Sequence, residues 1–404
     1  MENHKPELMY HDITLESSVE KLIKPSGLED IEFDENEFHY TQIGRKRREL
    51  TSLYHVYKDI PLHPFLLRYW AKLGLKKELF DASRDEGKYA YSVFTPLDMD
   101  PNKKYALIYY CHGGDETIGK AETSGFNMLA AVEKYIVVYA QNGGNYNEEV
   151  DTEFARIMGE LRKKGYPVDW SRVYAAGFGN GGSAAVCAAC TYPDMVAAVA
   201  VLPGGNPFLD LQFYKGLEYY ASTKGKRIPG IFIGGTIDKN NFPAPWITEY
   251  SGNELGAGSI ENAVSNLEIW LKEIAQAGNN SALSYEDIKE SLVNSEDPIK
   301  KEFGLNFDRA YAFRAQSVDW LGGDYFGTDG APVMRFVRAI GMPHEMWDNH
   351  SEMTRGGVMT AKWYRTYVVT ESEANIVWDY LKRFSRDKET CESLYSVVNC
   401  WGES

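Results

Sequence analysis

A glycine-rich turn at residues 177–182 has the residue spacing that comes nearest to a catalytic pattern. It reads Gly177-Phe-Gly179-Asn-Gly181-Gly, after a predicted strand at 172–176 and before the small-residue helix SAAVCAAC. A sharp strand-to-helix turn of the type G-x-S-x-G is a nucleophile elbow, which holds its central serine above a sheet in a strained conformation. Gly177 and Gly181 occupy the outer positions, and Gly179 stands where the serine would be. The turn therefore predicts an acyl-transfer site whose nucleophile position holds glycine.

The elements around this turn predict a parallel sheet covered by helices. From about residue 88, short β-rich runs alternate with helical patterns, and near-continuous apolar character indicates strands buried on both faces. We therefore expect an α/β fold with a mostly parallel central sheet and helices on both faces. Strands are predicted at 89–94, 105–110, 136–139, 172–176, 196–202, 230–234 and 333–340, helices at 126–134, 153–164, 182–191 and 259–278, and a last helix after a capping box at Thr370 and Glu373.

Composition divides the chain into three segments. Residues 1–87 are mixed and charged, and we expect them to form an N-terminal extension that packs on a core domain at 88–388, followed by a tail at 389–404. Within the core domain, residues 279 to about 325 interrupt the alternation of strands and helices just before the last strand. We expect this insertion to be a lid, because it would lie at the carboxyl edge of the sheet, where α/β proteins place their ligands.

The turn resembles the elbow of polyhydroxybutyrate-depolymerase-like and feruloyl-esterase-like α/β-hydrolases, whose usual sequence motif is G-x-S-N-G-G. His112-Gly113-Gly114 is similar to the HG turn of this family. The segments 124–127, 136–139 and 166–174 and the closing helix at 376–384 follow in the family's order. The resemblance covers roughly residues 88–386, about three quarters of the chain. It implies the α/β-hydrolase fold and hydrolysis of carboxylic esters without a cofactor.

The resemblance also implies roles for individual residues. Asp238 in the segment GGTID corresponds to the acid of a triad, although the family usually has histidine where Gly234 stands. His344 in the segment GMPH corresponds to the base, and the order nucleophile, acid, base is that of α/β-hydrolases. The oxyanion donors would be the backbone N–H of Asn180 and one N–H from Gly113 or Gly114. His112 would brace the oxyanion loop, and His350 is a rival base.

Glycine at position 179 excludes an acyl-enzyme, because it has no side-chain oxygen. The fold should not suffer, since glycine suits a strained backbone. Two origins fit: a deliberate or recent Ser→Gly loss in an active esterase, or a natural non-catalytic relative that binds a ligand or regulates. We favour the lost nucleophile, because Asp238, His344 and the HG turn remain in place. Ser183 cannot substitute for it, since it lies a full helical turn beyond the elbow.

Aromatic residues near the predicted site loops could line a substrate pocket. They would suit esters with aromatic acyl groups or esters linked to sugars, alongside the acetyl and polyester-like substrates that the family takes. The residues assigned to substrate binding are Trp246, Trp320, Tyr325 and Trp347, with Tyr250 and Phe326 nearby.

Two other readings of the site residues are less consistent with the sequence. The spacing G-x-G-x-x-G from Gly177 to Gly182 also occurs in dinucleotide-binding folds, which place an acidic residue at the end of the next strand. Here the next strand ends in Pro203-Gly-Gly, without a carboxylate. A metal site among the acidic residues and histidines at 344–352 lacks the H-E-x-x-H spacing that places two imidazoles on one helix face.

Charge and hydropathy limit the possible partners. The 58 acidic residues against 43 basic ones, with a net charge of −15, argue against binding to nucleic acid or an anionic membrane. No run of about 18 apolar residues is present, and the first twenty residues lack the apolar stretch of a signal peptide, so we expect a cytoplasmic protein. Five cysteines cannot form a disulfide framework, although Cys391 and Cys400 could pair. The expected partner is therefore a small or polymeric ester.

Overall fold

The structure is a computed structural model that describes residues 71, 74–80, 90–113, 118–122, 124–141, 149–203, 225–238, 264–278, 283–315, 318–342, 344 and 373–396. Most of the N-terminal extension predicted at 1–87 lies outside these residues. Its described end is β1 (Leu75–Phe80), which pairs antiparallel with β2 (Tyr91–Pro96), so this part of the segment is an edge strand of the sheet. Its charged, half-exposed sequence LKKELF is typical of an edge strand, which explains why the segment did not read as part of the core.

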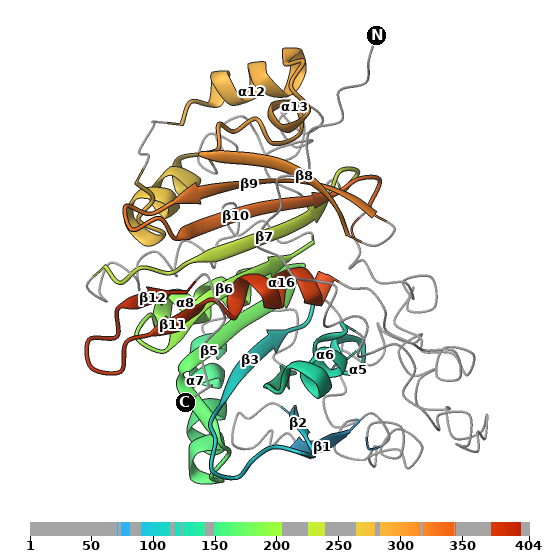
Figure 1. Ribbon diagram of the computed structural model, residues 1–404, viewed down its shortest axis with the longest axis vertical. Coiled ribbons are helices and arrows are strands. Elements are labelled where there is room, and N and C mark those ends of the chain that lie inside the picture. The colour runs from blue at the N-terminus through green and yellow to red at the C-terminus, as the bar shows by residue number, and fades with distance from the viewer. Residues whose placement is uncertain are drawn as a thin grey trace, which may run out of the picture.

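Within the described residues, the main sheet contains ten strands in the order β1-β2-β4-β3-β5-β6-β7-β10-β9-β8 (Figure 1). The six strands from β4 to β10 in this order are mutually parallel, and the pairs at both edges are antiparallel. The mostly parallel sheet expected from the sequence is thereby confirmed. The remaining strands are β3 (Tyr105–Cys111), β4 (Ile136–Ala140), β5 (Val168–Phe178), β6 (Val196–Leu202), β7 (Gly230–Gly235), β8 (Arg309–Ala315), β9 (Val318–Phe326) and β10 (Pro332–Ala339).

Helices cover both faces of this sheet, as expected. Successive side chains of a strand point to opposite faces, and β3 shows both layers. Tyr109 packs against Phe154 of α7 (Glu149–Lys163), with ring centroids 5.0 Å apart, and Tyr110 packs against Phe126 of α6 (Phe126–Glu133), with centroids 5.5 Å apart. The other helices are α5 (Ile118–Ala121), α8 (Asn180–Thr191), α12 (Tyr285–Asn294), α13 (Pro298–Phe303) and α16 (Glu373–Leu381), with a π-helical turn at Trp270–Ile274. None of the helices in the described part of the chain is both long and apolar enough to cross a bilayer.

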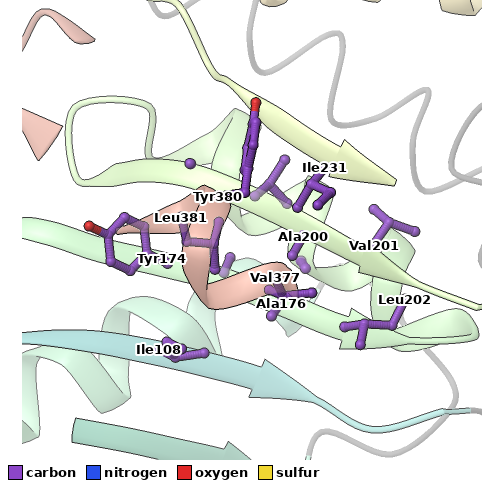
Figure 2. Packing of buried hydrophobic residues seen from close by; sticks show 14 of the residues in the cluster. Ile108, Tyr174, Ala176, Ala200, Val201, Leu202, Ile231, Val377, Tyr380 and Leu381 are labelled. Atoms are coloured by element: carbon purple, nitrogen blue, oxygen red, sulfur yellow. The ribbon is translucent and has the colours of Figure 1, made fainter. Parts of the chain in front are cut away.

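The closing helix α16 shows how the core is packed. Figure 2 shows Val377, Tyr380 and Leu381 of α16 facing side chains of the central strands, among them Ala176 and Ala200. All five residues are almost completely buried. The alanines allow the helix to approach the sheet closely, and each large apolar side chain buried there contributes roughly 1.5–3 kcal/mol. After α16 the chain forms a small two-stranded sheet from β11 (Phe384–Arg386) and β12 (Ser393–Tyr395).

The predicted lid is the main difference from the sequence-based expectation. Of residues 279 to about 325, the first part forms α12 and α13, while β8 and β9 extend the sheet beyond β10. β9 pairs with β10 from Phe326 opposite Pro332 to Trp320 opposite Ala339. The aromatic residues that suggested a lid over a pocket are also residues that favour strands, and here the strand preference prevails. This half of the insertion is therefore sheet, and the lid assignment is wrong for it.

The strand order identifies the edge at which a ligand would bind. From β3 the chain passes to β4 on one side, and β5 then lies on the other side of β3. In open α/β sheets, ligands bind outside the carboxyl ends of the strands at the point where the strand order reverses. Cys111 at the end of β3 is the register partner of Gly177 near the end of β5. The glycine-rich turn after β5 therefore lies at the edge of the sheet where a ligand is expected to bind.

Candidate active site

The turn between β5 and α8 has the sharp geometry expected of an elbow. A Cβ added to Gly177 would overlap the carbonyl oxygen of Gly181, and a Cβ added to Gly181 would overlap the carbonyl oxygen of Cys111. Both outer positions therefore require glycine, because backbone lies where a side chain would begin. The N–H of Gly179 donates to the carbonyl of Pro203 at 3.1 Å, which ties the turn to the end of β6.

Gly179 differs from the two glycines that flank it. Its φ of 57° and ψ of −127° lie in a region that residues with side chains rarely adopt. Among the described residues, a Cβ added to Gly179 would nevertheless meet two atoms within 4 Å, the Cα of Gly113 at 3.6 Å and Nε2 of His344 at 3.8 Å, which are ordinary van der Waals contacts. The turn therefore has room for a side chain at position 179. A hydroxyl one bond beyond that Cβ could reach His344.

His344 lies beside the carboxylate expected to pair with it. Its Nδ1 is 3.2 Å from each carboxylate oxygen of Asp238. The side chain of Asp238 is fully buried, whereas that of His344 is 40% exposed. Because a carboxylate only accepts, Nδ1 carries the proton and Nε2 is the basic nitrogen of the neutral ring. The ring of Phe178 lies 5.2 Å from the imidazole, centroid to centroid, and restricts its orientation from the side of the elbow.

Hydrogen bonds between two loops hold the Asp238–His344 pair in place. After β7, the N–H of Thr236 donates to Ala339 and the N–H of Ile237 donates to Met342, at 3.0 and 3.1 Å. In return, the N–H of Gly341 donates to the hydroxyl of Thr236 at 2.8 Å. β7 and β10 are neighbouring parallel strands, so the loops that follow them leave the sheet side by side. The predicted acid and the predicted base thus follow adjacent strands, although 106 positions separate them in sequence.

A neutral hydrogen-bond chain braces the turn after β3. His112 is fully buried, and its Nδ1 lies 2.7 Å from the carbonyl oxygen of Gly113, so Nδ1 donates. Nε2 of His112 then accepts from the side-chain amide of Gln141 at 3.2 Å, and the amide oxygen of Gln141 accepts from the N–H of Ile118 at 2.8 Å. The chain joins both ends of the segment that contains the predicted oxyanion residue Gly114, which lies outside the described residues. Bracing by His112 is what the sequence analysis expected.

Gln141 belongs to the candidate site and was not predicted from the sequence. It follows β4 directly and is 5% exposed, so its partners are buried protein groups. The available signal was a polar residue at the end of an apolar strand, at the same edge as the elbow. That signal alone does not identify His112 as its partner, since the two residues are 29 positions apart.

The structure brings together some of the predicted residues and separates others. Gly113, Gly179, Asp238 and His344 meet at one edge, and Asn180 begins α8, where the first N–H groups of a helix have no intrahelical acceptor. Trp246, Trp347, Gly114, Tyr250 and the rival base His350 lie outside the described residues. The possible pairing of Cys391 with Cys400 also falls there, because Cys400 is not described.

Two predicted substrate-binding residues are corrected. Trp320 is fully buried, with its ring 5.9 Å from that of Phe313, centroid to centroid, so it packs in the sheet. Tyr325 is 4% exposed and lies opposite Met334 near the start of β10, at the sheet edge away from His344. Both side chains belong to the core of the sheet extension. Among the described residues, no three histidine, cysteine or carboxylate side chains are grouped so as to hold a metal ion.

Comparisons with known proteins give partial matches. No family model matches the chain. A segment is 32% identical over 114 residues to poly(3-hydroxyalkanoate) depolymerase C of Paucimonas lemoignei, covering 24% of this chain and 28% of that protein. Another is 28% identical over 169 residues to a bifunctional acetylxylan esterase/xylanase of Neocallimastix patriciarum, covering 40% of this chain and 23% of that protein. The chain thus spans about a quarter of the length of these two curated relatives.

Solved structures give distant similarities. The feruloyl esterase module from Clostridium thermocellum, complexed with sinapinate, is 18% identical, with a TM-score of 0.38 over 72% of this chain and 85% of that one. An S-formylglutathione hydrolase from Agrobacterium tumefaciens is 15% identical, with a TM-score of 0.33 over 50% of this chain and 96% of that one.

Proposed function

We propose that this chain, which belongs to the esterase-like α/β-hydrolases, binds carboxylic esters at Gly179 and lacks the hydroxyl needed to cleave them through an acyl-enzyme. The observation that supports this most directly is the position of Nε2 of His344, 3.8 Å from where a Cβ on residue 179 would stand. The names of the relatives favour acetyl, hydroxyalkanoate or feruloyl esters as substrates.

With serine at position 179, the site would perform acyl transfer. The serine oxygen would attack the ester carbonyl while Nε2 of His344 takes its proton, and Asp238 would hold the ring tautomer and stabilise the imidazolium. The N–H of Asn180 and one N–H from Gly113 or Gly114 would stabilise the negative oxygen of the tetrahedral intermediate. The protonated imidazole would then give its proton to the leaving alcohol, and water would release the acid from the enzyme. In the present chain this reaction cannot begin, because Gly179 has no side-chain oxygen to attack the ester carbonyl.

Two origins of Gly179 remain to be separated. A deliberate or recent loss of serine would leave the rest of the site intact, and this agrees with the room at position 179 and with the Asp238–His344 contact. A natural non-catalytic relative would use the same edge of the sheet to bind a ligand or to regulate. Such a protein would not need a base that faces the turn at Gly179. We favour the lost nucleophile, because Nε2 of His344 faces that room.

Restoring the hydroxyl tests the proposal. We expect Gly179→Ser to hydrolyse p-nitrophenyl acetate or a feruloyl ester, with a gain that can approach the order of 10⁶ seen when a triad serine is removed elsewhere. A serine-directed phosphonate should abolish the activity, and Gly179→Ala, which adds the Cβ without the hydroxyl, should show none of this gain. If Gly179→Ser keeps the far-ultraviolet circular dichroism of the parent and cleaves no short ester, the chain is a binding module.

A further inference from the structure

An imidazole oriented by a carboxylate, as in the Asp238–His344 pair, can act as a base on water as well as on a serine hydroxyl. We infer that the chain, with Gly179 in place, slowly hydrolyses activated carboxylic esters by direct attack of a water molecule that this pair deprotonates. The inference rests on the proposed function, because the ester must bind at the turn. It adds an activity to a site that would otherwise only bind.

The first support is the direction in which the imidazole presents its basic nitrogen. Nδ1 is engaged by both oxygens of Asp238, each at 3.2 Å, so Nε2 is the atom that can accept a proton. Nε2 lies 3.8 Å from the Cβ position of residue 179. An oxygen atom placed over Gly179 is therefore within hydrogen-bonding reach of Nε2. In an esterase that place belongs to the serine hydroxyl, and here a solvent molecule can take it.

The second support is the difference in burial within the pair. The carboxylate of Asp238 is fully buried, while 40% of the His344 side chain is exposed. Water can therefore reach the imidazole, while the carboxylate that orients it stays shielded. The low dielectric around Asp238 strengthens its attraction for the imidazolium that forms when His344 accepts a proton. The pair thus combines solvent access with a buried counter-charge, as a general base acting on water requires.

The proposed reaction balances without another reactant. The water oxygen bonds to the ester carbonyl carbon as Nε2 takes one water proton, and the carbonyl π electrons move to its oxygen, which faces the N–H of Asn180 at the start of α8. The electrons then return, the bond from carbon to the alcohol oxygen breaks, and that oxygen takes the proton from Nε2. The products are the carboxylic acid and the alcohol, and the imidazole is neutral again. No covalent enzyme intermediate forms.

The route should be slow and selective for good leaving groups. A free water molecule loses translational and rotational freedom on reaching the transition state, whereas a serine hydroxyl is already held in place. General-base assistance alone contributes typically about 10²–10⁴-fold. We therefore expect the rate with p-nitrophenyl acetate to be about 10²-fold above that of a chain whose base is removed, and far below that of Gly179→Ser.

Gly179→Ala is the matched variant that separates this route from nonspecific residual activity. Its methyl group would contact Nε2 of His344 and Cα of Gly113, where the attacking water must stand, yet it adds no reactive group. Residual catalysis that came only from substrate binding and oxyanion stabilisation would be the same with Gly179 or alanine. If a water molecule over residue 179 is the nucleophile, Gly179→Ala should lose the activity as fully as His344→Gln does.

The experiment compares five chains with p-nitrophenyl acetate after treatment with a serine-directed phosphonate, which inactivates any contaminating serine esterase. The parent chain should show linear progress without a burst, a normal solvent deuterium isotope effect, and a rate about 10²-fold above His344→Gln, Asp238→Asn and Gly179→Ala. Gly179→Ser, assayed untreated, should show a burst and be inhibited by the phosphonate. Circular dichroism and thermal melting check that each variant is folded.

Each contrary result has a single meaning. If the parent chain is no faster than folded His344→Gln and Gly179→Ala while Gly179→Ser is active, the water route is overturned and the proposed function stands. If Gly179→Ser is folded and inactive, the serine mechanism itself is overturned. If Gly179→Ala retains the parent rate, the attacking water does not stand over residue 179, and the inference is wrong in its central feature.

Discussion

Two aspartates of this chain are buried to the same degree and have opposite surroundings. The side chains of Asp238 and Asp324 are both fully buried, and each contacts a basic side chain. Asp324 accepts from Arg335, which is 1% exposed, at 2.8 and 3.0 Å, and from Arg309 at 2.6 and 3.2 Å. Asp238 contacts Nδ1 of His344 with both carboxylate oxygens at 3.2 Å, and 40% of the His344 side chain is exposed.

The comparison shows that burial alone does not distinguish a carboxylate paired with two arginines inside a sheet from one that orients a partly exposed imidazole. At Asp324, charge is neutralised within the sheet extension of β8, β9 and β10, and the tyrosine hydroxyl of Tyr311 completes the group at 3.0 Å. At Asp238, the carboxylate orients a group whose other end faces Gly179. We therefore assign stability to Asp324 and chemistry to Asp238, and the following substitutions test that division.

The largest expected effect is on activity, at Asp238. In the Gly179→Ser background, Asp238→Asn should lower ester hydrolysis by about 10⁴-fold, because an amide cannot hold the imidazole in its working tautomer. The change is measured as kcat/KM with p-nitrophenyl acetate. The melting temperature should change little by comparison. Asp324→Asn is the matched control, and a similar loss of activity in its folded form would erase the division between the two aspartates.

The next largest effect is on stability, at Asp324. Asp324→Asn leaves Arg335 buried without its counter-charge, which typically costs about 3–5 kcal/mol. Urea denaturation should show this loss in the free energy of unfolding. A loss below about 1 kcal/mol, the usual upper range for a surface pair, would mean that the arginines find other partners and that Asp324 is not structural in the sense proposed.

The pH dependence of the free energy of unfolding is a second test of the structural role of Asp324. Burial by itself would raise the pKa of Asp324, but attraction to and hydrogen bonds from Arg335 and Arg309 outweigh it and hold the pKa below its usual value. The stabilisation is therefore complete above the unfolded pKa of about 3.9 and is lost as the pH falls toward the lower folded pKa. We expect urea midpoints to fall more steeply between pH 5 and pH 3 in the parent than in Asp324→Asn. Equal slopes would contradict the assignment.

A smaller effect distinguishes the glycines of the elbow. Gly177→Ala should destabilise the chain by about 3 kcal/mol or more, because its Cβ would overlap the carbonyl of Gly181 and overpacking against backbone is costly. Gly179→Ala should cost only about 1–3 kcal/mol, the strain of its backbone conformation. Denaturation midpoints check the order. A reversed order would mean that position 179, and not position 177, is shaped for glycine.

The smallest effect is expected at Gln141, which supports the candidate site through His112 without facing Gly179 itself. In the Gly179→Ser background, Gln141→Leu removes the donor to His112 and should lower kcat by about tenfold, less than the 10²–10³ for loss of a direct oxyanion donor. KM should change less than kcat, since Gln141 is buried and acts on the site through His112. Gln141→Glu, which keeps the acceptor for Ile118 but not the amide donor, separates the two hydrogen bonds.

The fold class could be predicted because the alternation of apolar strands and helices is visible in a single chain, and the spacing of Gly177, Gly179 and Gly181 located the turn. The roles of Asp238 and His344 followed from the resemblance to esterase-like α/β-hydrolases and not from their spacing alone. Features that depend on pairing between distant segments were not predictable. Trp320 and Tyr325 were misassigned because their burial follows from the register of β9 against β10. Gln141 was missed because its partner His112 ends a neighbouring strand.

The register between β7 and β10 has a consequence for how this protein could be rebuilt. Gly235 and Ala339 are paired across these strands, and the acid and base lie three and five positions beyond them. The separation of Asp238 and His344 is therefore determined largely by the backbone ladder between β7 and β10. The excursion through α12, α13, β8 and β9 does not set this distance, but it supplies Asp324, the counter-charge of the buried Arg335 in β10. A shorter linker or a grafted domain would have to run from the loop after β7 back to the start of β10 at Pro332 and provide both a strand to pair with β10 and a carboxylate for Arg335.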